Sequence, residues 1–151
     1  MQSANKGKRN RIDGSKLKIG IIVSRFNEDI TENMLKGALK TLKENKVRGG
    51  NIKIVYVPGS FEIPLACQRL ARLKKYDALV AIGCIIKGET DHFYYICNEA
   101  SRGIMDVMLK CGVPIGFGVL TCLNLKQAEI RSRGRENKGR EAAEAALIMT
   151  R

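Results

Sequence analysis

Four apolar runs of strand length recur along this chain, each followed by a segment with helical periodicity, and this alternation constrains the fold most strongly. The runs span residues 18–24, 51–57, 78–86 and 114–121. Strands that are apolar throughout are typical of a parallel sheet with both faces covered. We therefore predict an α/β protein: a three-layer αβα sandwich, flavodoxin-like, with a four-stranded parallel sheet and helices on both faces.

The segments between these runs carry apolar residues at helical spacing. Helices are predicted over residues 28–46, 62–74, 91–111 and 141–149. A further short helix is predicted after Asn124. Asn27, Ser60 and Asn124 stand where their side chains can cap the helices that follow them.

With 151 residues the chain is long enough for one domain with its own core. We assign this domain to residues 17–151 and a basic arm to residues 1–16. The arm has five cationic side chains and one acidic side chain, which gives it a net charge of +4. The arm has no apolar segment behind its charges, so it does not resemble a secretory signal, and we expect it to be disordered. No apolar run approaches the roughly 20 residues of a membrane span. We therefore expect a cytoplasmic protein.

The cysteine pattern argues against a metal site. Five cysteines stand at positions 67, 84, 97, 111 and 122, without a CxxC pair, and the chain has one histidine. An odd count inside predicted strands and helices is more typical of buried free thiols in a reducing compartment than of a zinc site.

The net charge of +12 is compatible with two kinds of partner. Nucleic acid is one explanation. The other is a solvated basic arm together with a binding site for a small phosphorylated anion. Aromatic residues make up only 5% of the chain and no RNA-binding signature is visible, so the second explanation is favoured.

Chemically distinctive residues follow the first three runs, where each predicted strand ends. They read Arg25-Phe26-Asn27, Pro58-Gly59-Ser60-Phe61-Glu62 and Lys87-Gly88-Glu89-Thr90-Asp91-His92. In parallel sheets of this kind, ligands bind beyond the carboxyl ends of the strands. His92, the only histidine, falls in the first turn of a predicted helix, which joins a group titrating near neutrality to an anion-binding helix start. We predict a ligand site at this edge.

Each of these residues also has a purely structural explanation. Phe26 can offer a flat face to a heterocycle, or pack beneath the first helix. Glu62 can accept hydrogen bonds from a polyhydroxylated ligand, or favour the start of its helix. Gly88 and Thr90 can seat a phosphate or form a turn, and His92 can be a surface residue. The phosphate-binding patterns GxxxxGK[ST] and GxGxxG are absent from the sequence.

Five segments, taken in order, are more specific than any single residue. They read SRFNEDIT, VPGSFEIP, GCIIKGETDHFYYICNEA, PIGFGVLT and NKG. In this combination the chain closely resembles the lumazine synthases of riboflavin biosynthesis over residues 17–149. The resemblance implies a transferase without cofactor or metal. Such an enzyme condenses 5-amino-6-(D-ribitylamino)uracil with 3,4-dihydroxy-2-butanone 4-phosphate to give 6,7-dimethyl-8-ribityllumazine, phosphate and water.

The same resemblance implies a role for each matched residue. His92 would be the catalytic proton shuttle. The uracil substrate and its ribityl chain would be held by Phe26, Asn27, Ser60, Phe61, Glu62, Ile85, Ile86 and Lys138, with Phe117 closing the pocket from a neighbouring subunit. The phosphate would be seated by Gly88, Glu89, Thr90 and Arg131. The segment Asn137-Lys138-Gly139 could alternatively only cap the last helix.

The segment between Gln127 and Asn137 is one residue shorter than is usual in lumazine synthases. Arg131 keeps the usual distance from Gln127, whereas a gap placed elsewhere would give the phosphate to Arg133. The resemblance also implies a homopentamer with active sites at subunit interfaces. Decamers and sixty-subunit shells are the alternatives. It further implies a functional link to riboflavin synthase. The short, arginine-rich segment favours a plain pentamer.

A second hypothesis is a non-catalytic oligomer of the same fold. It would bind a flavin- or lumazine-type ligand, or nucleic acid through the basic arm. Such a binder need not keep His92 or a phosphate arginine, and this chain has both. The enzyme is therefore the favoured hypothesis.

Overall fold

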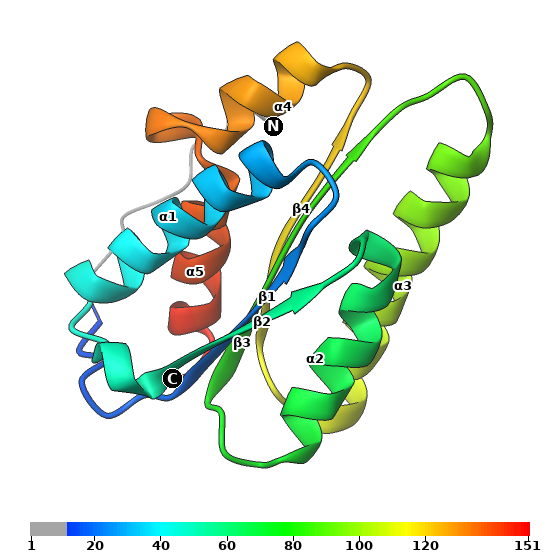
Figure 1. The fold of residues 1–151 in the computed structure, drawn as a ribbon. Coiled ribbons are helices and arrows are strands. Elements are labelled where there is room, and N and C mark those ends of the chain that lie inside the picture. Colours follow the sequence, from blue (N-terminus) through cyan, green and yellow to red (C-terminus); the bar gives the residue numbers. More distant parts are fainter. Residues whose placement is uncertain (1–11) are drawn as a thin grey trace.

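The computed structural model describes residues 12–151 and has one parallel sheet with helices on both of its faces (Figure 1). The strands are β1 (Ile19–Ser24), β2 (Ile52–Val57), β3 (Ala78–Ile86) and β4 (Ile115–Cys122), in the spatial order β2-β1-β3-β4. Every neighbouring pair in this sheet is parallel. The predicted four-stranded, flavodoxin-like sandwich is confirmed.

The helices form the two outer layers. They are α1 (Glu28–Glu44), α2 (Ile63–Arg72), α3 (His92–Cys111), α4 (Leu125–Ser132) and α5 (Lys138–Ile148), joined by the 3-10 turns η1 (Gly49–Asn51), η2 (Ser60–Glu62) and η3 (Gly134–Glu136). Helices α1, α4 and α5 lie on one face of the sheet, and α2 and α3 lie on the other (Figure 1). None of the helices in the described part of the chain is long and apolar enough to cross a membrane.

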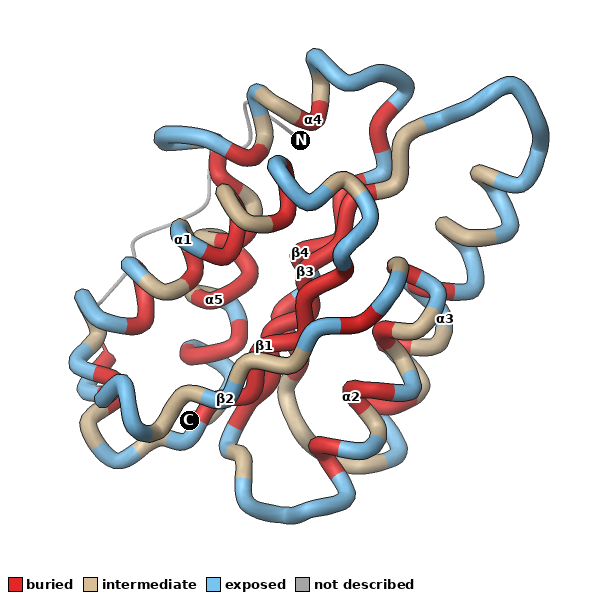
Figure 2. The backbone as a smooth tube through the Cα atoms, viewed as in Figure 1, coloured by how far each residue is buried: buried red, intermediate tan, exposed pale blue. Residues whose placement is uncertain are grey.

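Alternating side chains of β1 supply both layers of the core. Ile21 and Val23 belong to the hydrophobic cluster on the α1 and α5 side, whereas Ile22 belongs to the cluster on the α2 and α3 side. All three are fully buried, and Figure 2 shows how burial concentrates along the strands. A strand buried on both faces is apolar at nearly every position. This requirement explains why the first run could be recognised from the sequence.

Helix caps agree with the sequence at one position and differ at two. Asn124 caps α4 as predicted, because its Oδ1 accepts a hydrogen bond from the Gln127 N–H at 3.0 Å. The cap predictions for Asn27 and Ser60 are wrong, since neither side chain accepts a capping hydrogen bond. The Asn27 amide instead donates to the Cys84 carbonyl, and Ser60 opens η2 before the α-helix begins.

Element boundaries shift where the backbone turns. The helix predicted over residues 28–46 ends at Glu44, and Lys46 adopts a left-handed φ of 65° that reverses the chain. The last helix begins at Lys138, three residues before its predicted start, because Asn137 Oδ1 accepts a hydrogen bond from the Arg140 N–H and caps it. The third strand has the predicted bounds.

Residues 12–16 are anchored to the end of α1. Ile12 is buried, and its N–H donates to Asn45 Oδ1 at 2.9 Å. The Gly14 N–H donates to the Asn45 carbonyl at 2.8 Å. The expectation of disorder therefore does not hold for these five positions. The remainder of the predicted basic arm, residues 1–11, lies outside the described residues.

Candidate active site

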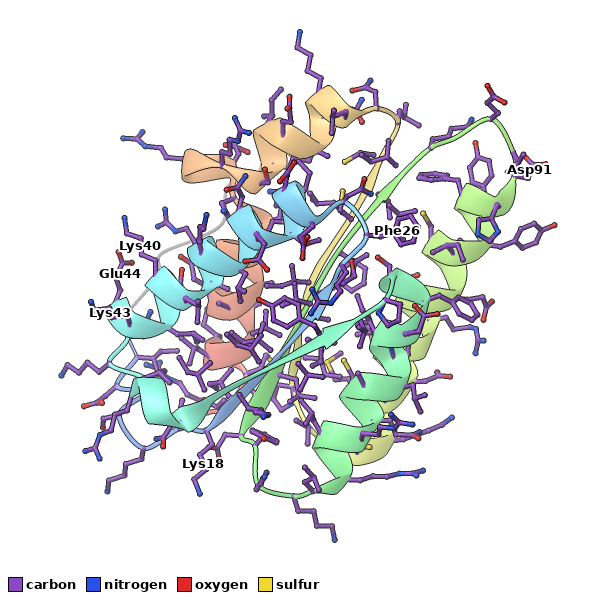
Figure 3. The ribbon with its side chains drawn as sticks, in the orientation of Figure 1. Lys18, Phe26, Lys40, Lys43, Glu44 and Asp91 are labelled. Atoms are coloured by element: carbon purple, nitrogen blue, oxygen red, sulfur yellow. The ribbon has the colours of Figure 1, made fainter. Side chains whose placement is uncertain are left out.

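A cavity of about 660 Å³ lies at the carboxyl end of the sheet. Its walls are built by the segments that follow β1, β2 and β3 and by the first two turns of α3. Figure 3 labels Phe26 after β1 and Asp91 at the start of α3, and both lie toward this end of the molecule. The volume is ordinary for a small-molecule site, and its place is the one that parallel sheets use for ligands.

Most of the residues predicted for the site line this cavity. They are Phe26, Asn27, Ser60, Phe61, Glu62, Ile85, Ile86, Gly88, Thr90 and His92. Sequence reasoning assigned no role to the wall residues Gly59, Cys84, Phe93, Tyr95 and Ile96. Tyr95 and Ile96 follow His92 by three and four positions, and this helical spacing was a usable signal that they share its face.

The segment that carries Phe26 is fastened to both neighbouring strands. The Arg25 N–H donates to the Val57 carbonyl at 2.9 Å, and the Phe26 N–H donates to the Pro58 carbonyl at 3.1 Å. On the other side, Asn27 Nδ2 donates to the Cys84 carbonyl at 2.9 Å. The Phe26 side chain is nevertheless 72% exposed, so packing beneath α1 does not explain it. A fixed backbone thus presents a free aromatic face to the cavity.

Asn27 has a left-handed backbone, with φ 56° and ψ 48°. Replacing Asn27 by alanine is expected to lower the free energy of unfolding by about 2 kcal/mol, because the Cys84 hydrogen bond is lost and a Cβ is held in a left-handed conformation. Glycine adopts that conformation freely, so Asn27→Gly should cost about 1 kcal/mol less than Asn27→Ala. Chemical denaturation measures both variants, and equal losses would contradict the role of backbone strain.

Ser60 brings an unused hydroxyl to the cavity. The residue is only 5% exposed, and its Oγ has no hydrogen-bond partner among the described residues. It sits over Gly83, where an added Cβ would lie 2.6 Å from that oxygen, so the absence of a side chain at Gly83 leaves the space for it. A buried hydroxyl without a partner is costly in a folded protein. A polar ligand group in the cavity would remove that cost.

Glu62 is held at the cavity wall by the turn before α2. Its Oε2 accepts a hydrogen bond from the Gly59 N–H at 2.8 Å. An added Cβ at Gly59 would lie 3.2 Å from that oxygen and 3.7 Å from the Phe26 ring, so the two functional side chains approach one another across this glycine. One carboxylate oxygen is thereby used for positioning, and the other can accept a hydrogen bond from a ligand hydroxyl.

The segment between β3 and α3 is anchored at one end and open at its centre. The Lys87 N–H donates to the Cys122 carbonyl at 2.9 Å, and Lys87 Nζ donates to the Tyr94 hydroxyl at 3.0 Å. That hydrogen bond raises the pKa of Lys87. A Cβ added at Gly88 would meet no atom within 4 Å, so the backbone is accessible there. His92 follows as the first residue of α3 and is exposed to both solvent and cavity.

Cys84 lines the cavity but is not suited to act as a nucleophile. Burial raises the pKa of its thiol to about 12, so the reactive thiolate is scarce at neutral pH. All five cysteines are free, as predicted, and Cys67, Cys84 and Cys122 are buried. Cys97 and Cys111 are only half-buried, so the prediction of burial is wrong for these two. Within residues 12–151, no group of three or more histidine, cysteine or acidic side chains is placed to hold a metal ion.

Thiol labelling should separate these cysteines. Burial also raises the pKa of Cys67 to about 12, so iodoacetamide at pH 8 is expected to leave Cys67 and Cys84 unmodified in the folded protein. The half-buried Cys97 and Cys111 should react before these two. Mass spectrometry of digested samples reads out each site, and protein unfolded in guanidinium serves as the fully labelled control. Rapid labelling of Cys84 in the folded protein would contradict its assignment as an inert wall residue.

Four predicted site residues do not line the cavity of their own chain. Glu89 is exposed on the segment after β3. Arg131 Nη1 donates to the Gln127 carbonyl at 3.0 Å, and Lys138 Nζ forms an ion pair with Glu141 Oε1 at 2.8 Å. Phe117 is 48% exposed on β4, which is an edge strand of the sheet.

A cavity of this kind, with polar groups and a histidine arranged around an exposed ring, is characteristic of α/β enzymes that bind small polar molecules at the carboxyl end of a parallel sheet. The comparison with known families defines the enzyme further. The family model of 6,7-dimethyl-8-ribityllumazine synthase matches residues 16–151. The chain therefore belongs to the 6,7-dimethyl-8-ribityllumazine synthase family, which comprises transferases of riboflavin biosynthesis.

Proposed function

We propose that this chain condenses 5-amino-6-(D-ribitylamino)uracil with 3,4-dihydroxy-2-butanone 4-phosphate to form 6,7-dimethyl-8-ribityllumazine, with release of phosphate and water. Membership of the family supports this reaction. The observation that carries the proposal is the cavity at the carboxyl end of the sheet. It joins an exposed ring at Phe26, an unpartnered hydroxyl at Ser60 and the only histidine of the sequence.

The uracil substrate would lie across the β1 and β2 ends of the cavity. Phe26 would stack on the pyrimidine ring, because its face is exposed and its backbone is fixed. Ser60 and Glu62 would bond the hydroxyls of the ribityl chain, since Ser60 has a free hydroxyl and Glu62 a carboxylate oxygen to offer. Asn27 Oδ1 would accept a hydrogen bond from the polar edge of the ring, because its Nδ2 already donates to the Cys84 carbonyl.

The phosphorylated butanone would lie at the start of α3. The accessible backbone at Gly88 and the hydroxyl of Thr90 would seat its phosphate, supported by the positive end of the helix. An amine of the uracil attacks the ketone and forms an imine with loss of water. Phosphate then leaves, and the resulting enol tautomerises to a ketone. Attack of the second amine on this ketone closes the ring and expels a second water. Each stage moves a proton, and His92 is placed to transfer it between ligand and solvent.

We further propose that Phe117, Arg131 and Lys138 serve the cavity of a neighbouring subunit in a homopentamer. All three lie outside the cavity of their own chain. Phe117 supports the idea most directly, because an exposed aromatic side chain on an edge strand is a natural contact for a second copy. Arg131 would complete the phosphate seat there. The lumazine product would pass to riboflavin synthase in the cytoplasm.

Purified protein mixed with both proposed substrates tests the reaction directly. Lumazine formation, followed by its absorbance and fluorescence, is expected to run well above the spontaneous background. The control omits the protein and keeps both substrates. Background rates from a protein that is folded and oligomeric would refute catalysis and favour the ligand-binding oligomer instead.

Phe26→Ala is expected to raise the KM for the uracil substrate about tenfold, because one stacked aromatic face contributes on the order of 1.4 kcal/mol. Its effect on stability should stay within about 0.5 kcal/mol, since the side chain is exposed. Steady-state kinetics and thermal unfolding measure the two effects. Phe26→Tyr keeps the ring and serves as the matched control. An unchanged KM in Phe26→Ala would remove Phe26 from substrate binding.

A further inference from the structure

A second cleft, of about 370 Å³, lies between α1 and the segment that joins α4 to α5. It shares no lining residue with the cavity at the end of the sheet. Among residues 12–151, four cationic side chains line it, and Glu44 is the only carboxylate that does. We propose that this cleft binds a multivalent phosphate anion of the pyrophosphate or nucleoside-diphosphate class. The inference does not depend on the proposed function.

The cations converge from separate elements. Lys36 and Lys40 are one helical turn apart on α1, Arg133 follows α4, and Arg140 belongs to α5. Like charges at the spacing of Lys36 and Lys40 repel each other on a helix. Within residues 12–151, no hydrogen bond or ion pair of the side chains engages Lys36, Lys40 or Arg133. An anion between them would relieve the repulsion and supply the missing partners.

The floor of the cleft is rigid. Asn137 Nδ2 donates to the Asn33 carbonyl at 2.8 Å and to the Ser132 carbonyl at 2.6 Å. Its side chain also packs on Gly37, where an added Cβ would approach Asn137 Oδ1 to 2.4 Å. These contacts join α1, α4 and α5 at a single buried side chain. The backbone positions that carry the cations are therefore fixed before binding, which lowers the entropy cost of binding a ligand.

Thr41 provides an independent indication of a polar occupant. It lines the same cleft, is only 2% exposed, and its Oγ1 has no hydrogen-bond partner among the described residues. Buried hydroxyls are normally satisfied. A phosphate oxygen is a suitable acceptor for this hydroxyl. The four cationic side chains around it favour an anionic ligand over a small neutral one.

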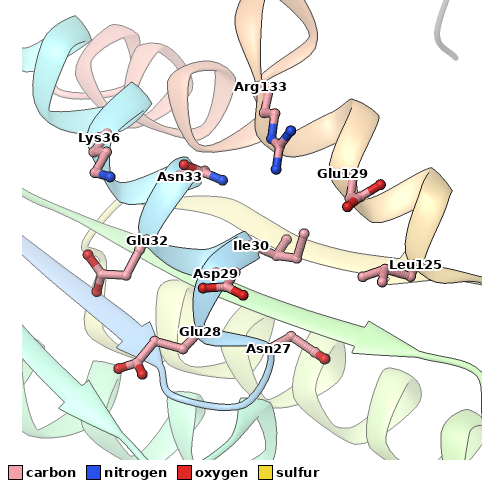
Figure 4. Close-up of a pocket in the computed structure, with 10 residues that line it drawn as sticks. All are labelled: Asn27, Glu28, Asp29, Ile30, Glu32, Asn33, Lys36, Leu125, Glu129 and Arg133. Atoms are coloured by element: carbon pink, nitrogen blue, oxygen red, sulfur yellow. The ribbon is translucent and has the colours of Figure 1, made fainter.

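The charge pattern along α1 fixes where the anion binds. The groove continues toward the start of α1 into a hollow where Lys36, Asn33 and Arg133 again contribute, as Figure 4 shows. There the carboxylates of Glu28, Asp29, Glu32 and Glu129 join the lining. An anion is thus repelled from that end and held between Lys36 and Arg140. Four cationic side chains carry more positive charge than a single carboxylate can neutralise, which favours a multivalent phosphate.

Isothermal titration with pyrophosphate at constant ionic strength tests the site. Lys36→Gln/Lys40→Gln is expected to weaken binding at least tenfold. The matched control is Lys43→Gln/Lys126→Gln, which removes the same charge from lysines that do not line the cleft and should stay within about twofold. Lys40 and Lys43 are both labelled on α1 in Figure 3. Thr90→Ala, which alters the other cavity, should leave this affinity unchanged.

Further variants and ligands define the contact. Thr41→Val keeps the shape and removes the hydroxyl, so it should weaken binding about threefold. Titration with ADP beside pyrophosphate distinguishes a nucleotide from free pyrophosphate as the natural source. Equal affinity in wild type and Lys36→Gln/Lys40→Gln would overturn the proposal. Equal weakening in both double variants would do so too, since it would show a diffuse charge effect rather than a site.

Discussion

Replacing His92 by alanine is expected to lower kcat about 10²-fold while the KM values stay within about threefold. His92 lines the cavity and begins α3, so its side chain can exchange protons with a bound ligand and with water. The reaction requires several proton transfers, and a positioned acid or base accelerates such steps by about 10² to 10⁴. Turnover should not vanish, because the variant still holds two reactive molecules together.

The design of this experiment separates chemistry from folding. His92 is exposed, so its truncation should not change the thermal unfolding midpoint. Asn98→Ala, an exposed position on α3 that does not line the cavity, is the matched control and should retain full kcat. Added imidazole is expected to restore part of the activity of His92→Ala and to leave the activity of Asn98→Ala unchanged. An unchanged kcat in His92→Ala would remove the histidine from the mechanism.

The fold could be predicted because each strand of a buried parallel sheet is a continuous apolar run in the sequence. β3 is apolar from Ala78 to Ile86, and the structure has these same bounds. Helix ends were harder, because they depend on hydrogen bonds made outside the helix. Asn27 follows β1 like a cap, yet its amide donates to Cys84, which is 57 residues away in the chain. Local sequence carries no record of that partner.

The site could be predicted in part for the same reason. The carboxyl ends of neighbouring parallel strands meet at one edge, so Phe26, Ser60 and His92 were expected together and do line one cavity. Phe117 lies on β4, Arg131 on α4 and Lys138 on α5, and a single subunit does not bring them to that cavity. The roles proposed for them require a contact between copies, which neither strand order nor helical spacing can specify.

The cationic cleft could not be predicted from the sequence, although its residues were visible. From the sequence, Arg133 was considered only as an alternative phosphate residue of the active site, and Arg140 received no role. Lys36 and Lys40 lie about a hundred residues earlier and look like an ordinary polar helix face. Only the packing of α1 against α5 brings the two sets together. That packing depends on close contact between the two helix backbones.

Gly139→Ala is expected to break that contact and lower the free energy of unfolding by about 3 kcal/mol. An added Cβ would lie 2.1 Å from the Met34 carbonyl oxygen and 2.6 Å from its carbon. Both atoms are backbone, so no change of rotamer can relieve the clash and the helices must separate. Alanine favours a helix over glycine by about 1 kcal/mol, which offsets only part of this cost.

Thermal and denaturant unfolding should detect the effect as a fall in melting temperature of about 10 °C, since each kcal/mol is worth about 2–4 °C at this size. Gly50→Ala is the control, because an added Cβ there meets no atom within 4 Å and should change stability by less than about 0.5 kcal/mol. Gly139→Ala should also weaken pyrophosphate binding, because the movement of α5 displaces Arg140. A stable variant with native affinity would contradict the close packing of α1 on α5.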